Sequence, residues 1–394
     1  MYSRNKIAIN IFLGTFFIWL IYMSLYITTN FKMFLGGSWG PRVIASVAIL
    51  LLFSKELISI KTNSYNSNFY AKTILLIVFA VSSVSFIVHN DGLISLSAIL
   101  LVISSRNINI FSTLKIFTIA ESIVLFLSII SSKIGLIQTL YMPSDDGLIR
   151  NSLGFSYVSF ASHHAFFLIC AYLILRRNQV KYIEYIFILI IILYLYRVTA
   201  TSSPFYLSLL AVFYDFLVVK IVKEDIIINN NVLKVVAILS FAIAFVIIIY
   251  FCSFASPDVV AVIDRLVHNR LHLSIDGIRN FGVTAFGQKV SFITLDIFGR
   301  YSGQYNYIDS SYVQSLVVNG WIFTFILIFL YCLATKWAIK QKYEIMTAFM
   351  VLASIQAMFD PQMFVLWYSP FVMILGKCFS MGDLAVNEES NEKI

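Results

Sequence analysis

Long apolar runs separated by short polar stretches form the main pattern along this chain. Residues 186–195 and 235–251 contain no charged side chain. A helix that crosses a bilayer needs roughly 20 mostly apolar residues, and backbone exposed to lipid must close its own hydrogen bonds in helices or a barrel. Barrel strands would give short alternating segments. The unbroken runs therefore predict membrane-spanning helices.

Twelve such spans are predicted, and the fourth is short enough to be re-entrant. Pro204 and Pro361 blur the boundaries beside them. The chain is expected to be one all-α integral membrane domain over residues 1–394, with a first outer loop at 131–158, a long outer loop at 253–310 and a mobile cytoplasmic tail at 381–394. The spans lie near residues 7–29, 41–60, 71–88, 92–105, 111–131, 159–175, 182–200, 204–222, 232–252, 311–335, 343–359 and 362–380.

Composition agrees with this pattern and excludes other classes. The chain is 60% hydrophobic and only 12% charged, and its mean hydropathy is +0.87. Too few polar residues are present to cover a water-soluble protein, and so apolar a chain cannot be disordered. Four cysteines do not make a disulfide framework in this length. We interpret them as small apolar packing residues.

Basic residues predict the orientation of the spans. With the N-terminus in the cytoplasm, the loops on that side hold 18 of the 28 Lys and Arg residues. The positive-inside rule therefore places both termini in the cytoplasm, and the net charge of +8 mostly reflects topology. No soluble segment has a basic and aromatic patch, so nucleic acid is not an expected partner. The first apolar run is too long for a cleavable signal peptide and is expected to remain as a span.

Polar residues concentrate in the two outer loops, and all five histidines map to the outer side, with His89 in a separate short turn. The long loop predicts a surface helix near 258–279. About 100° per residue places its polar side chains within roughly 80° of one another, opposite an apolar face, as in an interfacial helix. These polar residues are Arg265, His268, His272, Asp276 and Arg279. The helix either rests on lipid headgroups or roofs a cavity for an anionic headgroup.

Three further arginines have distinct settings. Arg270 falls in the middle of the apolar side of that helix, so it must snorkel or point into a protein cavity. Arg150 follows Asp145-Asp146 and is either their salt-bridge partner or a phosphate contact, because guanidinium matches phosphate oxygens. Arg197 lies near the outer end of the seventh span, where an arginine is costly without a purpose. We interpret the intramembrane acids Glu121 and Asp215 as paired structural groups.

Motifs for other chemistries are missing from the sequence. It has no Walker loop or dinucleotide fingerprint, and no His, Cys or carboxylate spacing typical of a metal site. Asp145-Asp146 could hold a divalent ion, although such a pair is more often a solvated turn. No cofactor is therefore expected, and the energy for any reaction would come from the substrate.

Three motifs, in order, resemble a known family. Arg150-Asn-Ser-Leu-Gly-Phe155 is similar to the first-loop signature of Wzy-type O-antigen and exopolysaccharide polymerases, which are related to O-antigen ligases. The second is Asp264-Arg-Leu-Val-His-Asn-Arg270-Leu followed by Phe281-Gly-Val-Thr-Ala-Phe-Gly-Gln288, and the third runs from Ile308 to Gly320. The resemblance covers about residues 150–320. The chain departs from the family at Thr199-Ala-Thr-Ser-Ser-Pro204, where a Thr-x-Ser-Arg-like element would carry an arginine after the serine, and Arg197 lies one turn earlier.

The resemblance implies a glycosyltransferase with a GT-C-like helical core. Such enzymes polymerise polyprenyl-diphosphate-linked oligosaccharide units on the outer face of the bacterial plasma membrane, without a metal. A chain-length regulator protein is an expected partner, besides membrane lipid. The alternatives are an O-antigen-ligase-type transferase and, from another class, a lipid-linked oligosaccharide flippase or other transporter, although no internal repeat favours transport.

Candidate roles follow from the chemistry of leaving-group departure. Cations aimed at the developing diphosphate charge would lower the barrier, and an acceptor hydroxyl needs a base or an orienting acceptor. Tyr312 could hold an acceptor sugar, or belong to an interfacial aromatic belt. The candidate cations are Arg150, Arg265, Arg270, Arg279 and Arg197, and the candidate bases are His163, His164, His268, His272 and Asp309.

Overall fold

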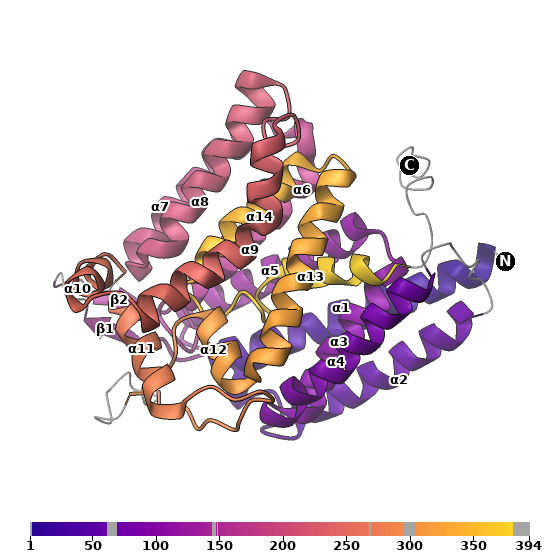
Figure 1. Cartoon of the computed structure of the whole chain (residues 1–394), viewed down its shortest axis with the longest axis horizontal. Coiled ribbons are helices and arrows are strands. Elements are labelled where there is room, and N and C mark those ends of the chain that lie inside the picture. The colour runs from indigo at the N-terminus through magenta and orange to yellow at the C-terminus, as the bar shows by residue number, and fades with distance from the viewer. Residues whose placement is uncertain are drawn as a thin grey trace.

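A computed structural model describes residues 2–60, 69–143, 147, 149–267, 269–294 and 305–380. These residues form an almost entirely helical protein (Figure 1). The α-helices are α1 (Tyr2–Thr28), α2 (Gly40–Ile60), α3 (Phe69–His89), α4 (Gly92–Ser104), α5 (Ile110–Lys133), α6 (Phe160–Arg176), α7 (Tyr182–Thr199), α8 (Ser202–Phe216), α9 (Asn231–Ser253), α10 (Pro257–Leu266), α11 (Arg270–Phe281), α12 (Ser311–Val318), α13 (Gly320–Lys340) and α14 (Glu344–Gln356).

Shorter elements connect or extend these helices. α8 continues as a π-helix over Leu217–Val222, and Pro370–Phe379 forms a 3-10 helix, η5. Three further 3-10 turns are η1 (Asn30–Met33), η2 (Ser105–Asn107) and η3 (Arg177–Gln179). The strands β1 (Tyr141–Pro143) and β2 (Ile149–Asn151) pair antiparallel, with Met142 opposite Arg150. This hairpin is the only sheet in the described part of the chain.

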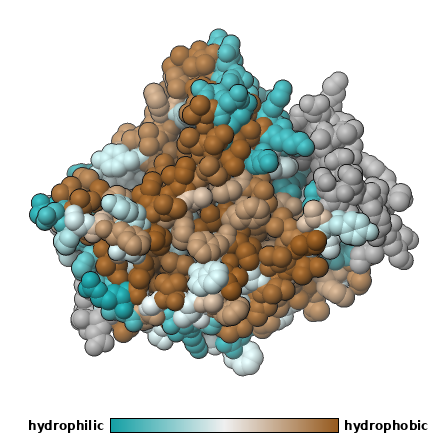
Figure 2. Space-filling view, viewed as in Figure 1, coloured by the Kyte–Doolittle hydropathy of each residue, from teal (hydrophilic) through white to brown (hydrophobic). Residues whose placement is uncertain are grey.

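Seven of the described helices are long and apolar enough to cross a membrane; six match predicted spans, and the seventh overlaps the span expected at 311–335. They cover Asn5–Thr28, Tyr70–His89, Ile110–Lys133, Tyr182–Thr199, Ser202–Val222, Asn231–Ser253 and Gly320–Lys340. An apolar surface between two more polar ends is typical of such a protein. Figure 2 shows a broad apolar band across the face that includes α9 and α13, with hydrophilic residues gathered at the top and the lower left.

Two predicted span boundaries are wrong. The span expected at 311–335 divides into α12 and α13 at Asn319 and Gly320, where Gly320 has a φ of +87°. The span expected at 362–380 is helical only from Pro370, and residues 357–369 form a series of turns. These turns lie largely inside the protein, where irregular backbone at membrane depth can satisfy its polar groups.

A contact between two glycines explains the break before α13. A Cβ on Gly287 would lie 2.1 Å from the Val318 carbonyl oxygen, and a Cβ on Gly320 would lie 2.3 Å from the Gly287 nitrogen. The Gln288 amide donates to the Val318 carbonyl at 2.9 Å. The chain after α11 therefore packs directly on the turn between α12 and α13, which brings two of the three sequence motifs into contact.

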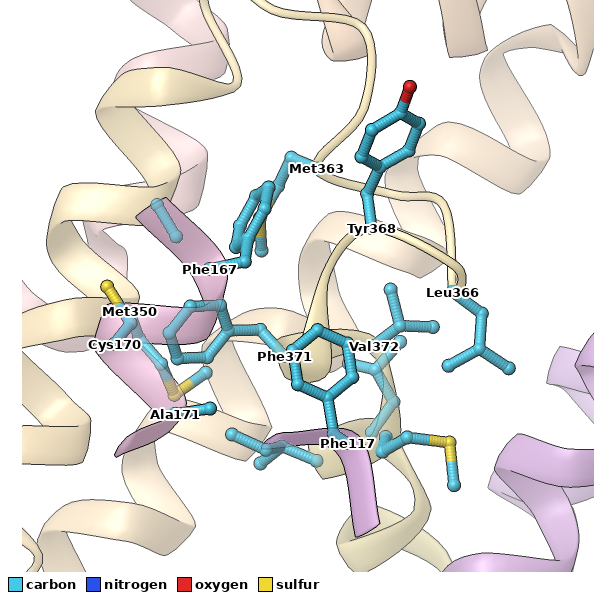
Figure 3. Close-up of a cluster of buried hydrophobic side chains, with 14 of the residues drawn as sticks. Phe117, Phe167, Cys170, Ala171, Met350, Met363, Leu366, Tyr368, Phe371 and Val372 are labelled. Carbon is cyan, nitrogen blue, oxygen red and sulfur yellow. The ribbon is translucent and has the colours of Figure 1, made fainter. Parts of the chain in front are cut away.

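The main apolar core extends through most of the helices, and one part of it lies between α5, α6, α14 and η5. Figure 3 shows aromatic side chains from three of these elements packed together, among them Phe117, Phe167 and Phe371. The phenol oxygen of Tyr368 points away from this cluster. Because Phe117 and Phe167 each lie about one helical turn from a buried polar residue, Glu121 and His163 or His164, the cluster forms one boundary of a buried polar region.

Candidate functional site

Two adjacent histidines begin the polar region, in the first turns of α6. His163 and His164 are both buried, with exposures of 1% and 0%. Successive residues on a helix point about 100° apart, so the two rings meet different elements. His164 Nδ1 lies 2.5 Å from Glu121 Oε2 on α5, and its Nε2 lies 3.1 Å from Thr28 Oγ1 at the end of α1. Glu121 also accepts from Ser24 at 2.9 Å.

His163 contacts a different carboxylate, that of Asp360, which lies in the turns after α14. Its Nε2 lies 2.8 Å from Asp360 Oδ2, and both side chains are 1% exposed. The Gln356 amide donates to His163 Nδ1 at 3.1 Å. Nδ1 thus accepts, and Nε2 carries the proton shared with Asp360. A buried carboxylate needs such partners, since an unpaired charge in the interior is very costly.

Asp360 also fixes the backbone around it. Its carbonyl accepts from the Ser311 amide at 3.0 Å and from the Ser311 hydroxyl at 2.6 Å. Its Oδ1 accepts from the Gln362 amide at 2.8 Å. One residue therefore ties α6 and α12 to the irregular segment 357–369.

Arg270 and Asp309 lie at the accessible side of this arrangement. Arg270 is the first residue of α11, and its Nη1 donates to the Phe359 carbonyl at 2.5 Å. Its Nε lies 3.9 Å from Asp309 Oδ2, and both side chains are 20% exposed. We call Arg270, Asp309, Asp360, His163 and Gln356 the Arg270–His163 cluster. It joins a partly exposed guanidinium to a buried histidine.

Electrostatics in the cluster favour a carboxyl group that titrates near neutrality. Burial raises the pKa of Asp309 to about 6, the nearby Arg270 charge opposes this rise, and the Asp360 charge adds to it. A carboxylate with a pKa near the working pH is suited to accept and release a proton. Burial likewise raises the pKa of the neighbouring Tyr307 to about 12, so this phenol remains a hydrogen-bond donor.

Arg150 connects the hairpin to the junction between α7 and α8, which in turn contacts the first turn of α6. Its Nε donates to the Thr199 carbonyl at 2.8 Å, and its Nη2 lies 3.4 Å from Thr201 Oγ1. Thr199 Oγ1 in turn lies 2.8 Å from Ser162 Oγ, beside His163. The two arginine-bearing motifs thus connect, through short chains of contacts, to neighbouring residues of α6. The alternative pairing of Arg150 with Asp145 or Asp146 falls outside the described residues.

The other predicted cations are placed elsewhere. The helix expected over 258–279 is wrong as one element, because Asn269 adopts a φ of +60° and separates α10 from α11. The break is stabilised by Asp264, whose Oδ1 accepts from the His272 amide at 3.0 Å. Arg265 and Arg279 are exposed on separate helices, and Arg197 is exposed in the last turn of α7.

Three more predicted residues lie outside the cluster or outside the described chain. His272 is exposed and pairs with Asp276 at 3.2 Å on its own helix. Tyr312 is completely buried, and its hydroxyl donates to the Ser354 carbonyl at 3.1 Å. It therefore packs in the core and does not face solvent. His268 lies outside the described residues.

The intramembrane acids have the partners that we expected. Glu121 binds His164 and Ser24, as described above. Asp215 on α8 accepts from the Tyr185 hydroxyl of α7 at 2.5 Å. Both are buried. The prediction that each is a paired group is confirmed.

Sequence reasoning missed Asp360, although a signal was present. Asp360 is the only acidic residue between Glu344 and Asp383, in an otherwise apolar stretch. It also lies near buried polar atoms that have no hydrogen-bond partner within the described part of the chain. These are Gln356 Oε1, Gln362 Oε1 and the Tyr368 hydroxyl. Unpaired buried groups commonly bind water or a ligand, so this region can accept further hydroxyl groups.

Comparison with known proteins does not extend this description. The chain matches no protein-family model, no curated protein and no solved structure. Among the described residues, no group of three or more His, Cys, Asp or Glu side chains is arranged to hold a metal ion. The fold and the site thus define a helical membrane protein with a partly exposed cationic and carboxylate cluster.

Proposed function

We propose that this chain is a glycosyltransferase that polymerises polyprenyl-diphosphate-linked oligosaccharide units on the outer face of the bacterial plasma membrane. The proposal includes twelve spans around a GT-C-like core, both termini in the cytoplasm, and a separate chain-length regulator as partner. The observation that carries it is the Arg270–His163 cluster, in which a guanidinium, a carboxyl group of raised pKa and a buried histidine lie together. Arg270 and Asp309 belong to two of the three sequence motifs.

Arg270 supplies the charge that the reaction needs. When the bond between the anomeric carbon and the diphosphate oxygen breaks, negative charge develops on the leaving polyprenyl diphosphate. Arg270 is already oriented by the Phe359 carbonyl and is 20% exposed. A preorganised donor of this kind stabilises developing charge most strongly where water is scarce.

Asp309 is the group that would take the acceptor proton. The acceptor hydroxyl forms the new bond to the anomeric carbon, and its proton passes to the Asp309 carboxylate. With a pKa of about 6, this carboxyl group is largely ionised at neutral pH and can return the proton to water or to the departing diphosphate. In this displacement, Arg270 therefore acts on the leaving diphosphate and Asp309 acts on the acceptor hydroxyl.

His163 and Asp360 lie on the buried side of the cluster and act as positioning residues. The Phe359 carbonyl that orients Arg270 directly precedes Asp360, and Asp360 is fixed by His163, Ser311 and Gln362. A shift of this segment would move the guanidinium. Because misplacement of about 1 Å can cost 100-fold in rate, these buried residues support the geometry without touching substrate.

The test uses purified full-length protein and a lipid-linked repeat unit of defined structure. Longer chains should form, with chelator present or absent, and Arg270→Ala should reduce the rate by about 100-fold or more, the loss typical of one key donor. Lys289→Ala removes an equal charge from an exposed position in the same outer segment and should retain wild-type activity. Thermal unfolding of each variant separates loss of activity from loss of folding.

Other products would point to the alternative functions. Transfer of preformed chains to a different lipid acceptor, without growth of the repeat unit, would indicate a ligase-type transferase. Movement of the lipid-linked unit across a vesicle membrane with no new glycosidic bond would indicate a flippase. Undiminished polymerisation by Arg270→Ala would refute the role of the cluster.

A further inference from the structure

A second site is present at one edge of the helical bundle. A cavity of about 370 Å³ lies between the end of α1, the start of α2 and the start of α4. It is lined by Tyr26, Ser38, Pro41, Arg42, Asp91, Gly92, Leu93 and Ile94. None of these residues belongs to the Arg270–His163 cluster. The volume is within the range of small-molecule sites, roughly 300–1,000 Å³.

The walls of this cavity are fixed by contacts outside it. The Tyr22 hydroxyl of α1 donates to the Leu35 carbonyl, which holds the loop before α2. A Cβ on Gly40 would lie 1.8 Å from that hydroxyl, so the close approach requires glycine. On the opposite side, the Asn90 amide donates to Asn319 Oδ1 at 2.9 Å and anchors the turn before α4. The site is therefore preformed.

Two opposite charges face this cavity. Arg42 lies in the first turn of α2 and is exposed, and Asp91 directly precedes α4 and is also exposed. Asp91 makes no side-chain capping bond to its own helix, and neither side chain forms a salt bridge with another described residue. A ligand with an anionic and a cationic group could contact both. The N-terminus of α2 adds further preference for the anion.

The cavity lies at the level where lipid headgroups are expected. It lies where two candidate membrane spans end, α1 at Thr28 and α3 at His89. Large apolar side chains are exposed close by in sequence, with Trp39 at 73% and Phe34 at 62%. Tryptophan is enriched at the membrane–water boundary. The α1, α2 and α4 helices pack side by side there (Figure 1), so the cavity opens beside the bilayer surface.

We propose that this cavity binds the headgroup of a zwitterionic phospholipid that carries a primary amine. The phosphate contacts Arg42 and the first turn of α2, and the ammonium group contacts Asp91. The site is independent of the proposed polymerase reaction. Its ligand is a lipid of the surrounding membrane and not the lipid-linked sugar.

Native mass spectrometry of the purified full chain in detergent tests this assignment. Phosphatidylethanolamine, phosphatidylcholine and phosphatidylglycerol with identical acyl chains are titrated separately. We expect phosphatidylethanolamine to bind about tenfold more tightly than phosphatidylglycerol, which corresponds to ~1.4 kcal/mol. Phosphatidylcholine should be intermediate, since its quaternary ammonium cannot donate a hydrogen bond. Equal binding of the three lipids, or a preference for phosphatidylglycerol, would overturn the proposal.

Three variants examine the contacts separately. Arg42→Ala should weaken all three phospholipids, and Asp91→Asn should remove only the preference for phosphatidylethanolamine. Gly92→Leu should block the cavity without disturbing the fold, because the nearest atom to a Cβ at this position is 3.8 Å away. Lys289→Ala is the control and should bind like wild type. Unchanged lipid binding by both Arg42→Ala and Gly92→Leu would refute the site.

Discussion

Replacement of Asp360 tests the link between the buried and the accessible parts of the cluster. Its carboxylate accepts two hydrogen bonds, from His163 Nε2 at 2.8 Å and from the Gln362 amide at 2.8 Å. Asp360→Ala would leave both buried donors without a partner. Loss of one partner from a buried ion pair costs about 3–5 kcal/mol, a large share of the stability of a typical protein domain.

Asp360→Asn is the more informative change because it preserves shape. The remaining oxygen can still accept from Gln362, but the charge opposite His163 is lost. A hydrogen bond to a charged group contributes about 1.5–3 kcal/mol, so the expected destabilisation is about half that of the alanine variant. Activity should fall as well, since the preceding Phe359 carbonyl orients Arg270.

Thermal unfolding in detergent and the polymerisation rate per folded molecule are the two measurements. Asp215→Asn is the matched control: it removes another buried carboxylate, bound to Tyr185 on α7, and should lower stability without lowering that rate. A double-mutant cycle with His163→Ala should show coupling, because the two side chains are in contact. Additive losses of stability, or wild-type activity in Asp360→Asn, would refute the proposed positioning role.

The remaining predictions concern four other residues. Because burial raises the pKa of Asp309 to about 6, polymerisation should decline as the pH falls through 6. The fold also favours the protonated carboxyl group, so Asp309→Asn should unfold at a higher temperature than wild type above pH 6. This difference should shrink as the pH falls and vanish below the ordinary aspartate pKa of 3.8. Gly320→Ala should lower the unfolding temperature markedly, since its Cβ would lie 2.3 Å from the Gly287 nitrogen. Arg150→Lys should reduce activity, because lysine cannot span the Thr199 carbonyl and the Thr201 hydroxyl, and an unimpaired lysine variant would contradict this. Tyr312→Phe should cost only about 1 kcal/mol of stability and retain sugar transfer; a large rise in KM for the acceptor would instead support direct contact with sugar.

Local patterns were sufficient for most of the long helices and for several polar residues. Continuous apolar runs predicted α7 and α9, because hydrophobicity over 20 residues depends only on neighbours in sequence. Arg270 was singled out because an arginine amid apolar side chains demands a partner, and in the structure it contacts Phe359 and Asp309. Charged residues within apolar segments can therefore be recognised from the sequence alone, because burying them in lipid is costly.

Pairings between distant residues depended on the tertiary structure. His163 and Gln356 are 193 positions apart, and no periodicity identifies which of several apolar helices will pack together. The break in the predicted 258–279 helix also required tertiary information. There the Asp264 side chain accepts a hydrogen bond from the His272 backbone amide, across the break at Asn269. In a chain this apolar, the sequence by itself determined that the long apolar runs form helices long enough to cross a membrane, because that choice follows from transfer to lipid. Only the packing of those helices decided that Asp360 meets His163 and that Tyr312 is buried, because nearly every helix face is apolar enough to lie against protein or lipid alike.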